Sequence, residues 1–182
     1  MAGAQSAARA VEKEARHDRR YWATAPALVY RTLGGAPWRR FLIKAQIFSD
    51  LHLGVHRIKL ITIMDGVDVV IVAGDTCEGV LKAFKHLRQI VPAHIPIILV
   101  MGNHEYYHRF VPDELALARS QASDFNIHLL EDNTVVLGGV RFLGASLWTD
   151  YAIFGDANQA AVMNACANGM NDHRLIGWQK QP

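Results

Sequence analysis

Apolar residues along this chain form short unbroken runs and helically spaced stripes, and both patterns begin near residue 41. The runs are short and rich in β-branched residues, which is typical of strands covered on both faces of a sheet. They cover Phe41 to Phe48, Val67 to Ala73 and Pro96 to Met101. A stripe at helical spacing follows the second run, from Val80 to Val91. Pro112 to Ala122, after the third run, is also predicted to be a helix, because Pro112 suits its first turn and Asp113 and Glu114 suit its N-terminal dipole. The pattern predicts an α/β fold built on a βαβαβ unit.

Beyond this unit the apolar runs become shorter. Three of them, Asn126 to Leu130, Thr134 to Leu137 and Val140 to Leu143, are joined by Asp-Asn and Gly-Gly pairs that favour turns. They predict a meander of short strands. A last stretch, Ala157 to Gly169, has the spacing of a helix, although it contains several asparagines.

Residues 1–40 differ in composition from the rest. They are rich in Ala and Arg, with eight basic and three acidic side chains, and they end near a Gly34-Gly35-Ala36-Pro37 break. The acidic residues argue against a transit peptide. We predict that residues 1–40 are a disordered N-terminal extension and that residues 41–182 form a single domain.

Polar blocks follow each of the three long apolar runs. They are Asp50-Leu51-His52, Gly74-Asp75 and Gly102-Asn103-His104-Glu105. In a parallel sheet the carboxyl ends of the strands point into one crevice, so residues that directly follow the strands come together. The separations between the blocks suit a strand, a crossover helix and the next strand. We therefore expect one site at this edge of the sheet.

The residue types in these blocks are those that bind divalent metals. A carboxylate can bridge two cations that together polarise a phosphoryl group, and Asp75 is the candidate for this bridge. Asp50 and His52 are expected to hold one ion, and the amide oxygen of Asn103 the other. Mixed nitrogen and oxygen ligands suit Mn²⁺, Fe or Zn²⁺. The sequence thus predicts two divalent metal ions as cofactors.

The third block also offers a catalytic group. His104, beside the ligand Asn103, is expected to act as general acid or as a stabiliser of the transition state near the leaving group. Glu105 is expected to accept a hydrogen bond that fixes an imidazole. Gly74 and Gly102 keep the backbone slim where it turns beside the ions.

The DLH, GD and GNHE blocks, in this order and spacing, resemble those of the calcineurin-like metallophosphoesterase family. The similarity runs from about Phe41 to the C-terminus and includes the segments Phe142 to Thr149 and Asn171 to Arg174. The resemblance implies a four-layer α/β/β/α sandwich and a metal-dependent phosphoric ester hydrolase. Its substrate would be a phosphate mono- or diester, cleaved at a dinuclear metal centre.

The family pattern continues with an isolated histidine and a GHxH block, and neither is present in this chain. We therefore expect the C-terminal part of the fold to be missing. One alternative is a truncated, catalytically inactive remnant that retains only weak metal binding. Another is that a partner chain completes the sandwich.

Composition excludes several other functions. The 19 basic and 17 acidic side chains give a net charge of +2, which is no nucleic-acid-binding signature. No apolar run approaches the roughly 20 residues of a membrane span, and only two cysteines are present. A cytoplasmic location is the expectation, with the oligomeric state left open. GxxxxGKS/T, GxGxxG and nucleophile-elbow motifs are also absent.

Overall fold

The computed structural model describes residues 42–53 and 61–178 of this chain. The expected N-terminal extension over residues 1–40 lies outside the described residues. The described part confirms the predicted α/β class, with a parallel sheet and helices packed on it.

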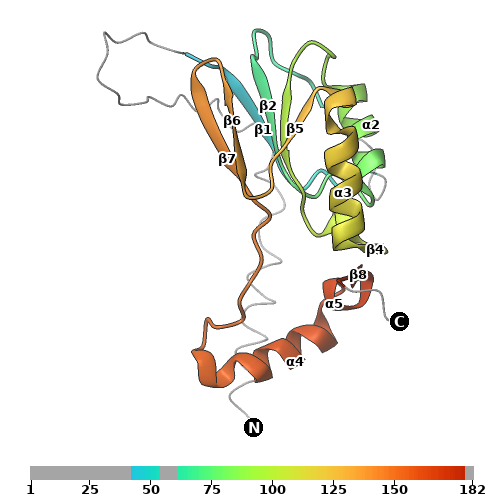
Figure 1. Ribbon diagram of the computed structural model, residues 1–182, viewed down its shortest axis with the longest axis vertical. Helices are drawn as coiled ribbons and strands as arrows, with labels where there is room; N and C mark the ends of the chain where they lie inside the picture. The colour runs from blue at the N-terminus through green and yellow to red at the C-terminus, as the bar shows by residue number, and fades with distance from the viewer. Residues whose placement is uncertain (1–41, 54–60, 179–182) are drawn as a thin grey trace, which may run out of the picture.

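A four-stranded parallel sheet forms the centre of the fold (Figure 1). Its strands are β1 (Ala45–Phe48), β2 (Val69–Ala73), β3 (Ile97–Val100) and β5 (Ile127–Leu129), in the order β1-β2-β3-β5. Phe48 is in register with Val72, and Val72 with Leu99. The three polar blocks therefore follow neighbouring strands at the same edge of the sheet.

Two helices cover one face of this sheet, α2 (Val80–Ile90) and α3 (Val111–Gln121) (Figure 1). Alternate residues of β2 and β3 point toward them, and the shared core includes Val70, Val72, Ile97, Leu99 and Phe84. Phe84 is fully buried. Burial of a side chain of this size stabilises the fold by roughly 1.5–3 kcal/mol.

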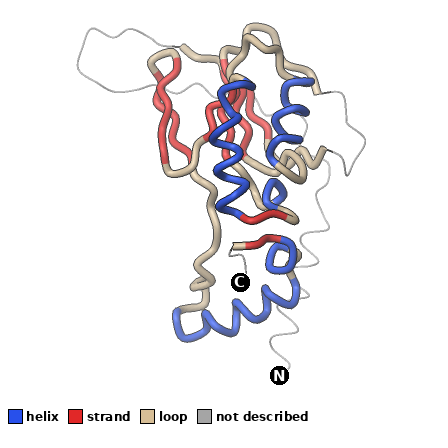
Figure 2. Tube along the Cα trace, turned by 45° about the vertical axis from the view of Figure 1, so that its right-hand side comes forward, coloured by secondary structure: helices blue, strands red, loops and turns tan. Residues whose placement is uncertain are grey.

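The other face packs against an antiparallel hairpin of β6 (Asn133–Leu137) and β7 (Val140–Gly144), seen from a second angle in Figure 2. The intervening residues of the sheet form this second core, in which Val69 and Ile98 pack with Val135 and Phe142. Both faces of β2 and β3 are thus covered. This arrangement explains why these strands lack the alternation of apolar and polar residues that one-sided strands have.

The predicted meander is wrong for its first strand. β5 does not pair with β6 but lies parallel to β3, with Ile127 beside Ile97. Ile127 is buried in the core beneath the helices, so β5 belongs to the covered central sheet. The physical reason is that α3 and the short 3₁₀ turn η2 (Ala122–Phe125) act as a crossover that returns the chain in the parallel direction.

The C-terminal segment lies beyond the carboxyl edge of the sheet (Figure 1). It contains a 3₁₀ turn, η3 (Asp156–Asn158), and then α4 (Gln159–Gly169), α5 (Asp172–Leu175) and β8 (Ile176–Gly177). β8 pairs in parallel with β4 (Arg109–Phe110), which directly precedes α3. Strands of two residues are too short to leave a periodic signal, so the sequence did not predict this contact.

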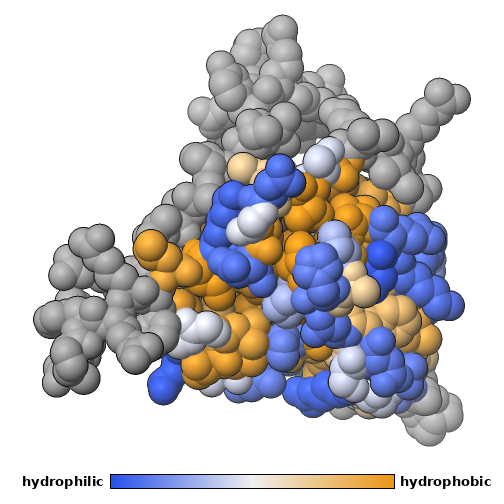
Figure 3. All heavy atoms as spheres, turned by 90° about the horizontal axis from the view of Figure 1, so that it is seen from above, coloured by the Kyte–Doolittle hydropathy of each residue, from blue (hydrophilic) through white to orange (hydrophobic). Residues whose placement is uncertain are grey.

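Apolar residues also remain at the surface. A groove of about 650 Å³ lies between the sheet and the hairpin, with Ile71, Val100, Phe142 and Leu147 among its lining residues. Figure 3, which looks onto the upper end of Figure 1, shows apolar residues between hydrophilic patches. Among the described helices none is long and apolar enough to cross a membrane.

Candidate metal centre

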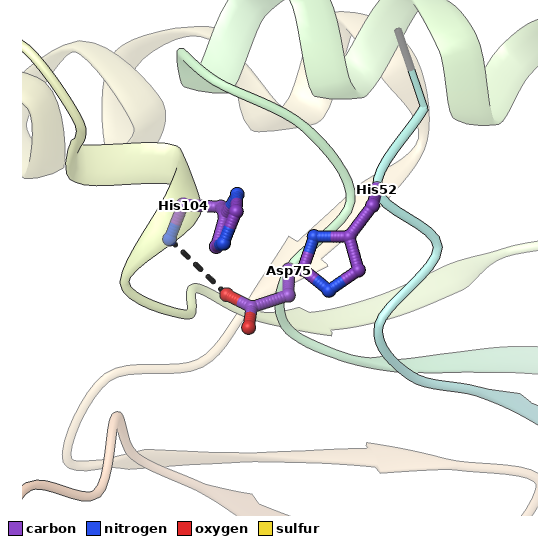
Figure 4. Close-up of side chains that lie close together, drawn as sticks. All are labelled: His52, Asp75 and His104. Atoms are coloured by element: carbon purple, nitrogen blue, oxygen red, sulfur yellow. Dashed lines mark hydrogen bonds between the residues drawn. The ribbon is translucent and has the colours of Figure 1, made fainter. Parts of the chain in front are cut away.

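Three side chains from the predicted blocks converge on one point (Figure 4). His52 follows β1, Asp75 follows β2, and His104 begins the 3₁₀ turn η1 (His104–Tyr106) after β3. One ligand atom of each lies within 4.8 Å of the others. The convergence of strand ends thus brings together residues that are far apart in the sequence.

Backbone hydrogen bonds hold the first two blocks side by side. The His52 N–H donates to the Asp75 carbonyl at 2.9 Å, and the Leu53 N–H donates to the Thr76 carbonyl at 2.6 Å. His52 and Asp75 both have a positive φ, 45° and 56°. This left-handed conformation is uncommon outside glycine, so the contacts between the two loops must maintain it.

The second and third blocks touch at their glycines. A Cβ on Gly102 would lie 2.1 Å from Asp75 Oδ1 and 2.7 Å from Asp75 N. A Cβ on Gly74 would lie 2.8 Å from Gly102 N. The predicted reason for these glycines, a slim backbone beside the site, is confirmed by this close approach.

Glu105 connects the loop after β2 to the loop after β3. Its carboxylate is fully buried and accepts hydrogen bonds from the backbone N–H groups of Thr76 (2.7 Å), Gly102 (2.8 Å) and Asp75 (3.1 Å). Burial raises the pKa of Glu105 to about 7, although the backbone donors act in the opposite direction. The expectation that Glu105 fixes an imidazole is wrong, because the backbone donors of the two loops take up its oxygens.

His104 is held over the site by its backbone and its ring contacts. Its N–H donates to Asp75 Oδ1 at 3.1 Å, and its ring centroid lies 4.3 Å from that of His52 and 4.4 Å from that of Tyr107. Its Nδ1 atom is buried and has no hydrogen-bond partner among the described residues. Buried polar atoms are normally paired, so a ring nitrogen without a partner marks a place for a ligand or a proton.

The donor set fits a divalent metal. Two imidazoles and one carboxylate within 4.8 Å of one another offer the nitrogen and oxygen ligands that Mn²⁺, Fe and Zn²⁺ accept. His104 was predicted as a catalytic group rather than a ligand, and its ring lies among the possible ligands. Both roles use the same ring.

The two other predicted ligands lie next to this group. Asp50 is largely exposed, and its Oδ1 is 3.8 Å from His52 Nε2. The amide nitrogen of Asn103 donates to Asp172 Oδ1 at 2.6 Å and to the Tyr107 hydroxyl at 3.0 Å. Asp172 was part of a segment noted in the sequence, but no local pattern indicated that it would contact Asn103.

A family model of the calcineurin-like phosphoesterase superfamily domain matches residues 43–172. The chain belongs to this superfamily. The match includes all three polar blocks as well as Asp172. It confirms the family that the sequence motifs resemble.

The fold is similar to that of a solved structure. The crystal structure of phosphopantetheinyl hydrolase (PptH) from Mycobacterium tuberculosis has a TM-score of 0.54 and 20% sequence identity to this chain. The similarity covers 76% of this chain and 56% of that one, so this chain spans just over half of its length. No curated protein matches this sequence. At this identity the likeness supports the fold alone.

Proposed function

We propose that this chain is a metal-dependent phosphoesterase that hydrolyses phosphate mono- or diesters with a dinuclear centre of Mn, Fe or Zn ions. The observation that carries the proposal is the convergence of His52, Asp75 and His104 from the ends of three strands. Membership of the calcineurin-like phosphoesterase superfamily supports it. The free thiols of Cys77 and Cys166 are consistent with a cytoplasmic location, which is part of the same proposal.

Each predicted ligand has a part in this proposal. Asp75, whose carboxylate lies between the two histidine-bearing loops, is the proposed bridge. Asp50 and His52 would hold one ion, and Asn103 would hold the other through its amide oxygen. When bound, the ions supply Lewis-acid polarisation of the phosphoryl group and activation of a water molecule.

The histidine ring of the third block handles the proton. His104 Nδ1 is buried and has no hydrogen-bond partner in the described part of the chain. We assign the His104 ring to donate a proton to the leaving-group oxygen or to stabilise charge that develops there. Tyr107 and His52 limit the motion of the ring through their contacts on two sides.

Glu105 contributes by keeping the loops in place before the substrate arrives. It ties Thr76 and Gly102, which come from different loops, to a single carboxylate. A site whose groups are already oriented loses less free energy to reorganisation during the reaction. Glu105 is therefore a positioning residue.

The direct test is turnover of an aryl phosphodiester and an aryl phosphomonoester with added Mn²⁺. The wild-type chain should hydrolyse at least one of them, and the preferred ester reports the substrate class. Asp75→Asn should abolish the rate, because an amide cannot bridge two cations as a carboxylate does. Asp156→Asn, a change at an exposed carboxylate outside the site, should leave the rate unchanged.

The outcome that contradicts the proposal is absence of turnover by the wild-type chain with Mn²⁺, Fe²⁺ and Zn²⁺. In that case, weak Mn²⁺ binding that depends on Asp75, measured by calorimetric titration, would identify an inactive remnant of the fold. If the wild-type chain does turn over, a rate that survives Asp75→Asn would also contradict the proposal, because it would show that the hydrolysis arises elsewhere or from a contaminant.

A further inference from the structure

A closed triangle of hydrogen bonds joins the C-terminal helix α5 to the third block. Asn103 Nδ2 donates to Asp172 Oδ1 at 2.6 Å and to the Tyr107 hydroxyl at 3.0 Å. The Tyr107 hydroxyl donates to the same Asp172 oxygen at 2.7 Å. Asp172 and Tyr107 are each only 8% exposed, so water competes little for these bonds. The three side chains thus form one hydrogen-bonded unit, in which Tyr107 and Asp172 are buried.

The triangle determines which way the Asn103 amide faces. An amide nitrogen is a donor only, and this one donates to Asp172 Oδ1 and to the Tyr107 hydroxyl. Rotation of the amide by half a turn would put its oxygen at the same 2.6 Å distance from the Asp172 carboxylate. Two acceptors at that distance repel each other, so the rotated state is unfavourable. Among the residues that the structure describes, none donates to Asn103 Oδ1, which leaves this oxygen available.

We propose that Asp172 is a positioning residue for the metal centre, which fixes the Asn103 amide with its oxygen free to bind a divalent cation. This inference rests on the proposed function, because it assumes that Asn103 is a metal ligand. Tyr107 completes the arrangement. Partners that orient a metal ligand in this way commonly change metal affinity 10- to 100-fold when they are removed.

A further observation supports a role in the site. Tyr107, whose hydroxyl accepts the hydrogen bond from the Asn103 amide, also has its ring centroid 4.4 Å from that of His104, so one side chain contacts both residues of the third block.

The position of Asp172 is itself fixed by the fold. The His108 N–H donates to the Leu175 carbonyl at 2.7 Å, and β8 pairs with β4 just after His108. These bonds hold α5 against the segment that follows the third block. These contacts bring Asp172 next to a site whose other residues lie between positions 50 and 107.

The test compares three variants of the full chain, Asp172→Ala, Asp172→Asn and Tyr107→Phe, by calorimetric titration with MnCl₂. Asp172→Ala should weaken Mn²⁺ binding about 10- to 100-fold. Asp172→Asn keeps an acceptor oxygen and should restore most of the affinity, which a role based only on negative charge would not allow. Tyr107→Phe removes one of two acceptors and should have a smaller but measurable effect. Asp156→Ala is the control at an exposed site.

A second readout needs no metal. The side-chain amide protons of Asn103 in a ¹H–¹⁵N spectrum report their hydrogen bonds. Asp172→Ala should shift these resonances and speed their exchange with water, while Asp172→Asn should change them less. The spectrum is recorded in EDTA. It therefore reports the orientation of the Asn103 amide whether or not the chain has the proposed activity.

Several results would overturn the inference. They are wild-type Mn²⁺ affinity in a folded Asp172→Ala variant, unchanged Asn103 resonances in that variant, and equal losses in Asp172→Asn and Asp172→Ala. Should Asp172→Ala not fold, unchanged Mn²⁺ binding by Tyr107→Phe has the same meaning. A wild-type chain that binds no Mn²⁺ would instead reject the proposed function, and the metal-free spectrum would still decide whether Asp172 orients the amide.

Discussion

The contact between Gly102 and Asp75 makes Gly102→Ala a sharp test of the site geometry. The new Cβ would lie 2.1 Å from Asp75 Oδ1 and 2.7 Å from Asp75 N. The carboxylate can rotate, but the backbone nitrogen is restrained because it donates to Glu105 Oε2. The loop that bears Asp75 and the loop that bears Gly102 must therefore move apart.

The expected cost follows from these contacts. Overpacking of one methyl group costs about 1–3 kcal/mol, and loss of the hydrogen bond to Glu105 adds about 1 kcal/mol. We expect the free energy of unfolding to fall by roughly 2–4 kcal/mol, which many domains of this size tolerate. Since Asp75 is displaced, Mn²⁺ binding should weaken at least about 10-fold, as it does when metal ligands lose their orientation.

Urea unfolding followed by circular dichroism measures the first quantity, and calorimetric titration with Mn²⁺ measures the second. Gly169→Ala is the matched control, because a Cβ there meets nothing within 4 Å. Gly169 is the last residue of α4, where alanine should be neutral or stabilise by up to about 1 kcal/mol. If Gly102→Ala has the same free energy of unfolding and the same Mn²⁺ affinity as the wild type, the two loops do not approach each other as closely as described.

Two further predictions concern buried ionisable groups. Burial raises the pKa of Glu105 from its ordinary value of 4.5 to about 7, so in EDTA its contribution to stability is present below about pH 4.5. This contribution is lost as the pH rises to about 7, and the free energy of unfolding should decrease by up to about 3 kcal/mol over that range. In Glu105→Gln the free energy of unfolding should depend less on pH. Equal slopes of this free energy against pH in the variant and the wild type would contradict the prediction. Burial likewise raises the pKa of the Cys77 thiol to about 11, whereas Cys166 is partly exposed. A thiol reagent at pH 8 should therefore label Cys166 in the native protein and Cys77 only after unfolding, and fast native labelling of both would refute this.

The sequence determined three of the four strands of the central sheet, β1, β2 and β3, because their signals are local. Unbroken β-branched runs indicated strands covered on both faces, and a helical stripe and the helix start at Pro112 indicated the helices that cover one of them. From parallel strands alone it followed that residues after each strand meet at one edge. His52, Asp75 and His104 do meet there, within 4.8 Å. Asp50 lies beside them, but its side chain is more exposed than that of His52. Its place in the motif did not predict this exposure.

Only the tertiary structure decided which distant groups pair. β5 could have begun a meander, but the crossover through α3 places it beside β3, a choice that strand propensity does not encode. The partners of Glu105 are backbone N–H groups, which every residue except proline has and which therefore leave no signal in a sequence. Asp172 reaches Asn103 across 69 residues because β8 pairs with β4. Such contacts depend on how the whole chain packs to satisfy its buried polar groups, and no local pattern of residues can specify them.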